Sequence, residues 1–212
     1  MKLNNNEAAL IVDKLIDTIQ ANKQYLSDID GLIGDGDHGV NMNKGFTMCR
    51  QALDSNPGDL SHSMLALAKI LMLKIGGSMG PLYGKFFKGF AMEVNGIEEI
   101  SMEDYNRALA AMLSSIQSIS PAKPGDKTLV DTLAPAVEAF DKATKCGKSF
   151  SDGLDDLIQA AIEGRDSTKE MVAQLGRASR LGERSRGVLD AGATSCCLIL
   201  ETMATNTKLL LK

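Results

Sequence analysis

The apolar residues of this 212-residue chain recur with the period of an α-helix along most of its length. Between residues 5 and 25, for example, Ala, Ile, Val or Leu occupies positions 8, 11, 12, 15, 16 and 19, which all lie on one face of a helix. No segment shows the sustained alternation of apolar and polar residues that is typical of a half-buried strand. Tryptophan is absent and methionine is plentiful, a composition that suits helix packing more than a sheet. The sequence therefore predicts an all-α fold.

Turn signals divide the helical pattern into about eight helices. Neither internal repeats nor a linker-like change in composition occurs, so residues 1–212 are expected to form one domain. Helices joined by short loops pack as antiparallel neighbours, which predicts an antiparallel bundle. The expected helices cover residues 5–25, 39–53, 60–75, 81–92, 102–119, 128–145, 150–164 and 192–208, with a shorter helical segment over residues 167–176.

Charge and cysteine content exclude several classes of protein. The formal net charge of −4 gives no reason to expect nonspecific nucleic-acid binding. No apolar run is long enough to cross a bilayer, and the first residues do not resemble a secretory signal, so no membrane association is expected. The chain has four cysteines without a C-x-x-C pair, which favours a reduced cytoplasmic protein.

Three carboxylates, Asp30, Asp35 and Asp37, fall within eight positions and are interspersed with glycines. Such crowding is unfavourable without a cation, because each carboxylate raises the pKa of its neighbours. Oxygen ligands without cysteine point to Mg²⁺ or Ca²⁺ rather than to zinc. Glycines allow the backbone to turn tightly and to approach a bound phosphate closely. The sequence predicts a metal site here; the alternative is a solvated polar loop.

Three familiar ligand-binding patterns do not account for these motifs. Gly34-x-Gly36-x-x-Gly39 has the spacing of a dinucleotide-binding loop, but the segment before it has a helical pattern instead of a strand. A calcium-binding EF-hand loop needs glutamate at its twelfth position, which is Phe46 here. The phosphate-binding loop of nucleotide hydrolases needs Ser or Thr after its lysine, but Lys85 is followed by Phe86.

Three further loops carry unusual residues: Gly76–Pro81 is rich in glycine, Ser120–Thr128 is rich in turn residues, and Gly176–Ala193 holds four arginines in ten positions. Taken alone, the first could be a tight turn between helices and the last a solvated charged face. However, these loops and the aspartate loop follow the first, third, fifth and seventh long helices. Alternate loops of an antiparallel bundle lie at the same end. We therefore expect all four loops at one rim.

Each loop offers a group that suits phosphate or nucleotide binding. The helix starts near Gly39, Ser78 and Gly192 present backbone N–H groups and the positive end of the helix dipole to anions. Arg177 offers a planar fork for phosphate or a surface for stacking on a base. Mg²⁺ typically binds through one or two carboxylates together with phosphate oxygens. The combination predicts a site for a metal–nucleotide complex.

Motifs along nearly the whole chain resemble those of the nucleotide-binding subunit of dihydroxyacetone kinase, the DhaL family. They are Leu26-x-x-x-Asp30-x-x-Ile33-Gly-Asp-x-Asp-His-Gly-x-Asn-Met42, Gly76-Gly-Ser78, Gly80-Pro-Leu-Tyr-Gly-x-Phe-Phe87, Pro124-Gly-Asp-Lys-Thr128, Gly176-Arg-Ala-Ser-x-Leu-Gly-Glu-Arg-Ser185 and Asp190-x-Gly-Ala-Thr-Ser195.

The resemblance implies an eight-helix antiparallel barrel with ADP (or ATP) and two Mg²⁺ at one rim. It implies that Asp30, Asp35 and Asp37 hold the magnesium ions, and that no side chain acts as a catalytic nucleophile. Residues on the phosphate side of the nucleotide would be His38, Gly39, Val40, Asn41, Ser78 and Met79. Residues on the adenosine side would be Ser120, Leu129, Arg177, Asp190, Ala191 and Gly192.

The implied activity is that of a phosphotransferase subunit in glycerol metabolism. A phosphohistidine protein would phosphorylate the bound ADP, and the phosphoryl group would pass to dihydroxyacetone on a separate substrate-binding subunit. A homodimer is a further expectation. Two alternatives stay open: a nucleotide-state sensor that regulates a transcription factor, and a relative serving another small ketose or a fatty-acid kinase. Met79 and Ala191 stand where many family members have serine and proline, which leaves the ketose undefined.

Overall fold

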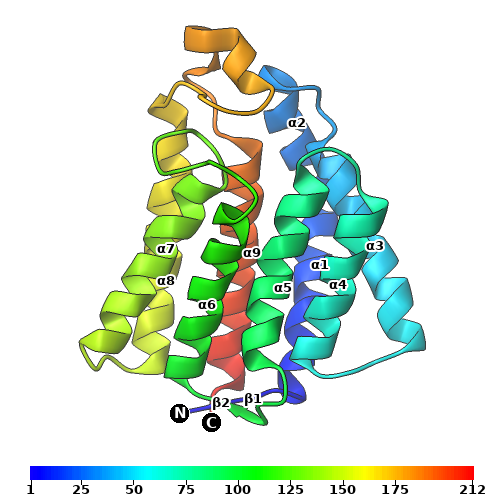
Figure 1. The fold of residues 1–212 in the computed structure, drawn as a ribbon, viewed down its shortest axis with the longest axis vertical. Coiled ribbons are helices and arrows are strands. Elements are labelled where there is room, and N and C mark those ends of the chain that lie inside the picture. Colours follow the sequence, from blue (N-terminus) through cyan, green and yellow to red (C-terminus); the bar gives the residue numbers. More distant parts are fainter.

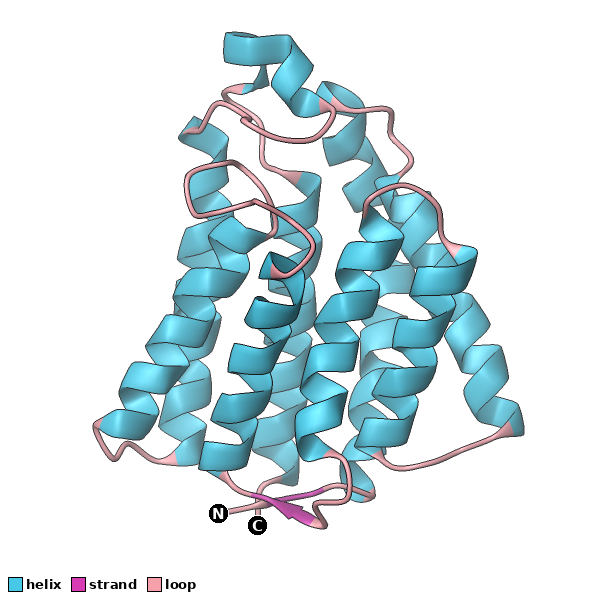
Figure 2. Ribbon diagram, in the orientation of Figure 1, coloured by secondary structure: helices cyan, strands magenta, loops and turns pink.

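The computed structural model describes residues 1–212 and confirms the all-α fold (Figures 1 and 2). A two-stranded antiparallel sheet, β1 (Leu3–Asn4) with β2 (Glu99–Ile100), lies near the chain termini. The 3₁₀ helices are η1 (Glu7–Ala9), η2 (Thr168–Glu170) and η3 (Ala178–Ser185). The α-helices are α1 (Leu10–Ala21), α2 (Lys23–Ile33), α3 (His38–Ser55), α4 (Leu60–Lys74), α5 (Met79–Val94), α6 (Met102–Gln117), α7 (Val130–Lys145), α8 (Phe150–Ser167) and α9 (Ala191–Leu210).

Eight of these helices form a closed barrel. From α3 to α9 each helix packs against the next one along the chain, α1 packs against α3, and α9 returns to pack against α1. Neighbouring helices run in opposite directions around the ring (Figure 1). The remaining helix, α2, follows α1 almost directly and packs on α3 and α9 at one end of the barrel. The predicted antiparallel barrel of eight helices is thus confirmed.

The apolar faces predicted from the sequence fill the interior of the ring. Helix α1 buries Ile11, Val12, Leu15, Ile16 and Ile19, all members of the expected stripe. These side chains belong to one contiguous core of 48 buried residues drawn from every helix of the barrel. Burial of apolar surface on this scale is the main favourable contribution to folding. None of the helices combines the length and hydropathy that crossing a membrane would require.

The expected helix over residues 5–25 is wrong in its boundaries, because it ends at Ala21 and a new helix starts at Lys23. The Asn22 side chain donates a hydrogen bond of 2.9 Å to the carbonyl of Thr18, and such local bonds compete with helix continuation. Asp30 consequently lies on the last turns of α2 and not in a loop.

The helical segment expected over residues 167–176 is also wrong beyond its first residues. Ser167 is the last residue of α8, Thr168–Glu170 forms a single 3₁₀ turn, and residues 171–176 are not helical. The chain after this turn packs on the connector between α6 and α7, where the backbone N–H of Gln174 donates a hydrogen bond of 3.1 Å to the carbonyl of Asp126. A backbone contact with a distant segment has replaced the local helix.

All four unusual loops lie at the same end of the barrel, opposite the two chain termini (Figure 1). They are the turn between α2 and α3, the turn between α4 and α5, the connector between α6 and α7, and the segment between α8 and α9, which includes η2 and η3. The arrangement expected from loop parity is therefore confirmed, and this end is called the rim.

Candidate functional site

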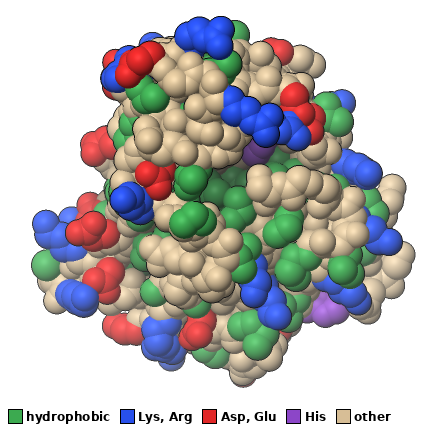
Figure 3. Space-filling model, turned by 45° about the horizontal axis from the view of Figure 1, so that its top comes forward, with side chains coloured by type: hydrophobic (Ala, Val, Ile, Leu, Met, Phe, Trp, Pro, Cys, Tyr) green, Lys and Arg blue, Asp and Glu red, His purple; other side chains and the backbone are tan.

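A cavity of about 620 Å³ opens at the rim, and all four loops contribute to its lining. Its size falls within the range of roughly 300–1,000 Å³ that is usual for small-molecule sites. Figure 3, in which the rim comes forward, shows this face hollowed below the projecting top of the molecule, with hydrophobic side chains inside the hollow. A cavity with both apolar and charged walls can hold the base and the phosphates of one nucleotide.

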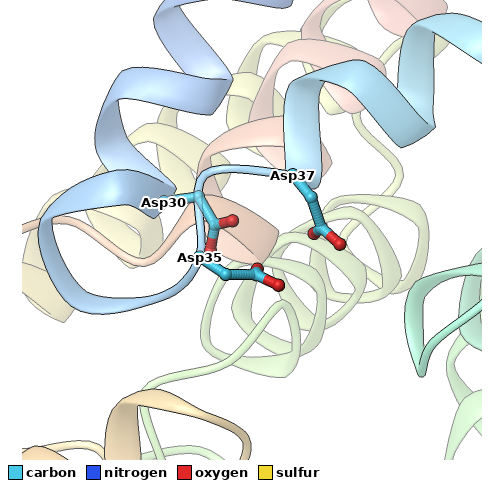
Figure 4. A group of neighbouring side chains, drawn as sticks. All are labelled: Asp30, Asp35 and Asp37. Carbon is cyan, nitrogen blue, oxygen red and sulfur yellow. The ribbon is translucent and has the colours of Figure 1, made fainter.

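Asp30, Asp35 and Asp37 converge at one side of this cavity (Figure 4). Each offers a carboxylate oxygen, and the three oxygens lie within 4.8 Å of one another. Asp30 is half-buried at the end of α2 and accepts a hydrogen bond of 3.2 Å from the backbone N–H of His38. A side chain at position 34 would overlap the Asp30 carboxylate, which explains the glycine there. Three convergent carboxylates suit a hard divalent cation such as Mg²⁺.

Arg177, in the segment between α8 and α9, contacts two of these carboxylates. Its guanidinium pairs with Asp35, and Nη1 lies 3.7 Å from Asp37 Oδ2. The family resemblance places Arg177 on the adenosine side, whereas its side chain lies beside the candidate metal ligands. A cationic group between these acids shows that the cluster attracts positive charge.

Three helices begin at the cavity. Helix α3 starts at His38, α5 at Met79 and α9 at Ala191, and each of these first residues lines the cavity. The start of α9 is fixed by Asp190, whose carboxylate accepts a hydrogen bond of 2.7 Å from the N–H of Ala193. Burial raises the pKa of Asp190 to about 6, and the nearby carboxylate of Asp131 adds to this effect. Helix N-termini that face one cavity provide several N–H donors for phosphate oxygens.

His38 is held from behind by hydroxyl groups. Its Nε2 lies 2.8 Å from Ser195 Oγ, which in turn lies 2.6 Å from the hydroxyl of Tyr83. Burial lowers the pKa of His38 to about 4, although the negative charge of Asp30 opposes the shift. The imidazole is therefore neutral at pH 7 in the protein without ligands.

The predicted site residues all line this cavity except Gly39 and Val40. A side chain at position 39 would overlap the backbone carbonyl of Lys23, so Gly39 allows α3 to cross closely over α2. Val40 lies on the outer side of the first turn of α3, with 49% of its surface exposed. Neither residue lines the cavity: Gly39 is needed for the close approach of the two helices, and the Val40 side chain is turned to solvent.

Lys127 also lines the cavity, although it is not among the predicted site residues. It has a backbone φ of +60°, a left-handed conformation that a lysine adopts only when its surroundings hold it. Its buried ammonium donates to three backbone carbonyls, those of Met171 (3.2 Å), Ser185 (2.6 Å) and Val188 (2.6 Å). All its hydrogens are thus used to hold the segment between α8 and α9. Only its place in the Pro124–Thr128 motif could have drawn attention to it.

Comparison with known proteins decides the family. Residues 32–205 match the model of the DAK2 domain. The chain is 39% identical to the ADP-binding subunit DhaL of a PTS-dependent dihydroxyacetone kinase from Lactococcus lactis, over 90% of this chain and 91% of that protein. It is 38% identical to the ADP-binding subunit DhaL of PEP-dependent dihydroxyacetone kinase 1 from Listeria innocua, over 87% and 88% of the two chains.

The chain belongs to the DhaL family. The predicted family is thereby confirmed. Among solved structures, the fold is similar to that of the dihydroxyacetone kinase of C. freundii in complex with AMP-PNP and Mg²⁺, with a TM-score of 0.69 and 22% identity. That similarity covers 97% of this chain but only 35% of the kinase, so a DhaL fold corresponds to one part of the larger protein.

Proposed function

We propose that this DhaL protein is the nucleotide-binding subunit of a dihydroxyacetone kinase, with ADP as its coenzyme and two Mg²⁺ held by Asp30, Asp35 and Asp37. The observation that carries the proposal is the convergence of three carboxylates and three helix N-termini on one cavity, in a member of this family. When bound, the magnesium ions would neutralise the phosphate charge and polarise the group being transferred.

The residues of the chain divide between the two ends of such a nucleotide. The start of α3, with Asn41, directly follows the carboxylates in the chain, and the start of α5, with Ser78, lines the same cavity, so both suit the phosphates. The apolar lining residues Leu129 and Leu82 suit a base. Arg177 can reach the phosphate end, because its guanidinium already lies beside Asp35. Phosphoryl transfer needs positioning and charge neutralisation more than a protein nucleophile, which fits a cavity of this kind.

The similar proteins are ADP-binding subunits, which supports a separate substrate-binding subunit, and the two histidines of this chain make other contacts. The only histidines are His38 and His62. The Nε2 atom of His38 is engaged by Ser195, and His62 lies at the start of α4, away from the cavity, where its Nε2 contacts Asn56. We infer that the phosphoryl group reaches the ADP from a phosphohistidine protein and leaves it for dihydroxyacetone on the partner subunit. A cytoplasmic location and a homodimer are part of the same proposal.

A mixing experiment tests this function. The purified chain is incubated with dihydroxyacetone alone, with dihydroxyacetone and ATP, and with dihydroxyacetone, a substrate-binding subunit and a phosphohistidine donor. Product is expected only in the complete mixture, and Asp35→Asn should abolish it there. Dihydroxyacetone phosphate made by the chain and ATP alone would contradict the proposal. Binding of ADP without transfer in the complete mixture would instead favour a nucleotide sensor.

A further inference from the structure

Three side chains from three helices meet at the wall of the cavity: His38 of α3, Tyr83 of α5 and Ser195 of α9, of which His38 and Tyr83 line it. Ser195 Oγ lies 2.8 Å from His38 Nε2 and 2.6 Å from the Tyr83 hydroxyl oxygen. Tyr83 and Ser195 are buried, with 1% and 0% of their surfaces exposed. The proposed function uses His38 but gives no role to the other two residues. The Ser195 hydroxyl contacts His38 directly, and the Tyr83 hydroxyl contacts that of Ser195, so the two can affect which imidazole nitrogen carries the hydrogen.

The carbonyl of Gly192 completes this network, since it lies 3.0 Å from the Tyr83 hydroxyl and 3.1 Å from Ser195 Oγ. Each hydroxyl carries one hydrogen and the carbonyl carries none. If Nε2 carries no hydrogen, Ser195 must donate to His38, and Tyr83 can then satisfy only one of its two contacts. If Nε2 carries the hydrogen, His38 donates to Ser195 and both hydroxyl hydrogens stay available for the remaining contacts. The second arrangement therefore makes one more hydrogen bond than the first.

We propose that Ser195 is a positioning residue that fixes His38 as the tautomer with its hydrogen on Nε2, so that Nδ1 faces the cavity as a hydrogen-bond acceptor. His38 lines the cavity. Its Nδ1 makes no hydrogen bond within the protein and is not fully buried, so a ligand in the cavity can approach it. The use of this acceptor rests on the proposed function.

An acceptor at this position suits the metal side of the site more than the phosphates. A phosphate oxygen carries no hydrogen to give to Nδ1, whereas a water molecule on a magnesium ion does, and Mg²⁺ usually keeps several waters. The backbone N–H of the same residue already holds the carboxylate of Asp30. His38 would therefore support the cation twice, through Asp30 and through a metal-bound water. Groups in such supporting positions orient the ligands of a metal.

The imidazole nitrogens report the tautomer directly. The full chain is labelled with ¹⁵N, and long-range proton–nitrogen correlations are recorded at pH 7 without metal or nucleotide. Only two histidines contribute, and His62→Gln identifies the signals of His38. In the wild type, Nε2 should give the shift of a protonated nitrogen and Nδ1 that of an unprotonated one. The opposite pattern would overturn the proposal.

Two variants separate positioning from a merely structural role. Ser195→Ala should shift His38 toward a mixture of tautomers, whereas an unchanged pattern would overturn the proposal. Tyr83→Phe should keep the wild-type tautomer, because Ser195 can still accept from His38 and donate to Gly192. The matched control is Thr194→Val, which removes a buried hydroxyl that donates to the Asp190 carbonyl on the same helix and should leave the His38 signals unchanged.

Binding of ADP with Mg²⁺ tests the link to the ligand. Ser195→Ala should weaken it about tenfold, the lower end of the effect usual for groups that support metal ligands. Thr194→Val should not weaken it. A tautomer change without loss of affinity would overturn the role assigned to Nδ1. A wild-type chain that fails to bind ADP with Mg²⁺ would refute the proposed function instead, and it would leave the tautomer assignment intact because that is measured without ligands.

Discussion

Replacing Lys127 by methionine tests whether the rim is held together by one buried ammonium. The side chain is 1% exposed, and its Nζ donates to the carbonyls of Met171, Ser185 and Val188. Hydrogen bonds from a charged donor contribute about 1.5–3 kcal/mol each. The two bonds of 2.6 Å would thus account for about 3–6 kcal/mol. Removal of a charge whose burial is unfavourable offsets part of this loss.

We therefore expect Lys127→Met to lower the free energy of unfolding by about 2–4 kcal/mol, less than the gross sum of its hydrogen bonds. For a chain of this length that corresponds to a fall of about 5–15 °C in the melting temperature. Urea and thermal unfolding are measured in EDTA, without nucleotide, so that ligand binding does not mask the change. Lys123→Met is the matched control, because Lys123 is exposed and its side chain makes no hydrogen bond. It should change the stability by less than about 0.5 kcal/mol.

The segment between α8 and α9 could also detach without unfolding the barrel, and hydrogen exchange distinguishes the two outcomes. The amides of Ala173 and Gly187 donate to Ser185 Oγ (2.9 Å) and to the carbonyl of Lys169 (2.7 Å), both within this segment. In Lys127→Met they should lose protection even if the global stability falls by less than expected. Unchanged stability together with unchanged protection of both amides from exchange would show that Lys127 does not hold this segment in place.

Four other results are expected. Asp35→Asn should abolish the retention of ADP after gel filtration, whereas Asp28→Asn should not, because Asp28 is an exposed acid of α2 outside the cluster. Treatment of the wild type with EDTA should also abolish the retention of ADP. ADP with Mg²⁺ at 100 times the dissociation constant should stabilise the fold by about 2.7 kcal/mol, which thermal unfolding would register, and an indifferent melting curve would argue against a nucleotide site. Gly39→Ala should destabilise the chain by about 1–3 kcal/mol in urea unfolding, because its Cβ would overlap backbone, whereas Gly76→Ala meets open space and should be nearly neutral. Arg177→Gln should change the affinity of the nucleotide-free chain for Mg²⁺ by less than about fivefold in calorimetric titration, because the ion pair that it removes is exposed.

The barrel and the grouping of the loops could be predicted because both follow from local patterns. The apolar stripe of α1 marks its buried face, and the number of helices between loops determines the end at which each loop lies. The break at Asn22 could not be predicted in this way. The residues before and after it continue the same apolar pattern, and only the bond from the Asn22 side chain to Thr18 shows that the helix stops there.

The contacts that shape the cavity could not be predicted because they join distant segments. Tyr83 and Ser195 are 112 positions apart, and Lys127 holds a carbonyl 61 positions further along the chain. A periodic pattern indicates which face of a helix is buried, but it does not indicate which other segment that face contacts. Gly39 shows the same limit, since its motif suggested a phosphate contact and the structure shows a close crossing of α2 and α3.

The position of Arg177 bears on how three carboxylates can lie together before any metal binds. Asp35 and Asp37 repel each other and Asp30, and the guanidinium of Arg177 offsets part of that repulsion. The three paired side chains are 54%, 46% and 51% exposed, and exposed ion pairs contribute only about 0–1 kcal/mol. A ligand bound with micromolar affinity provides about 8 kcal/mol, so the pair cannot block the site. A bound cation would repel the guanidinium of Arg177, and the phosphates of the proposed nucleotide would offer that guanidinium another anionic partner. One arginine can thus stabilise the free cluster and then neutralise the bound nucleotide.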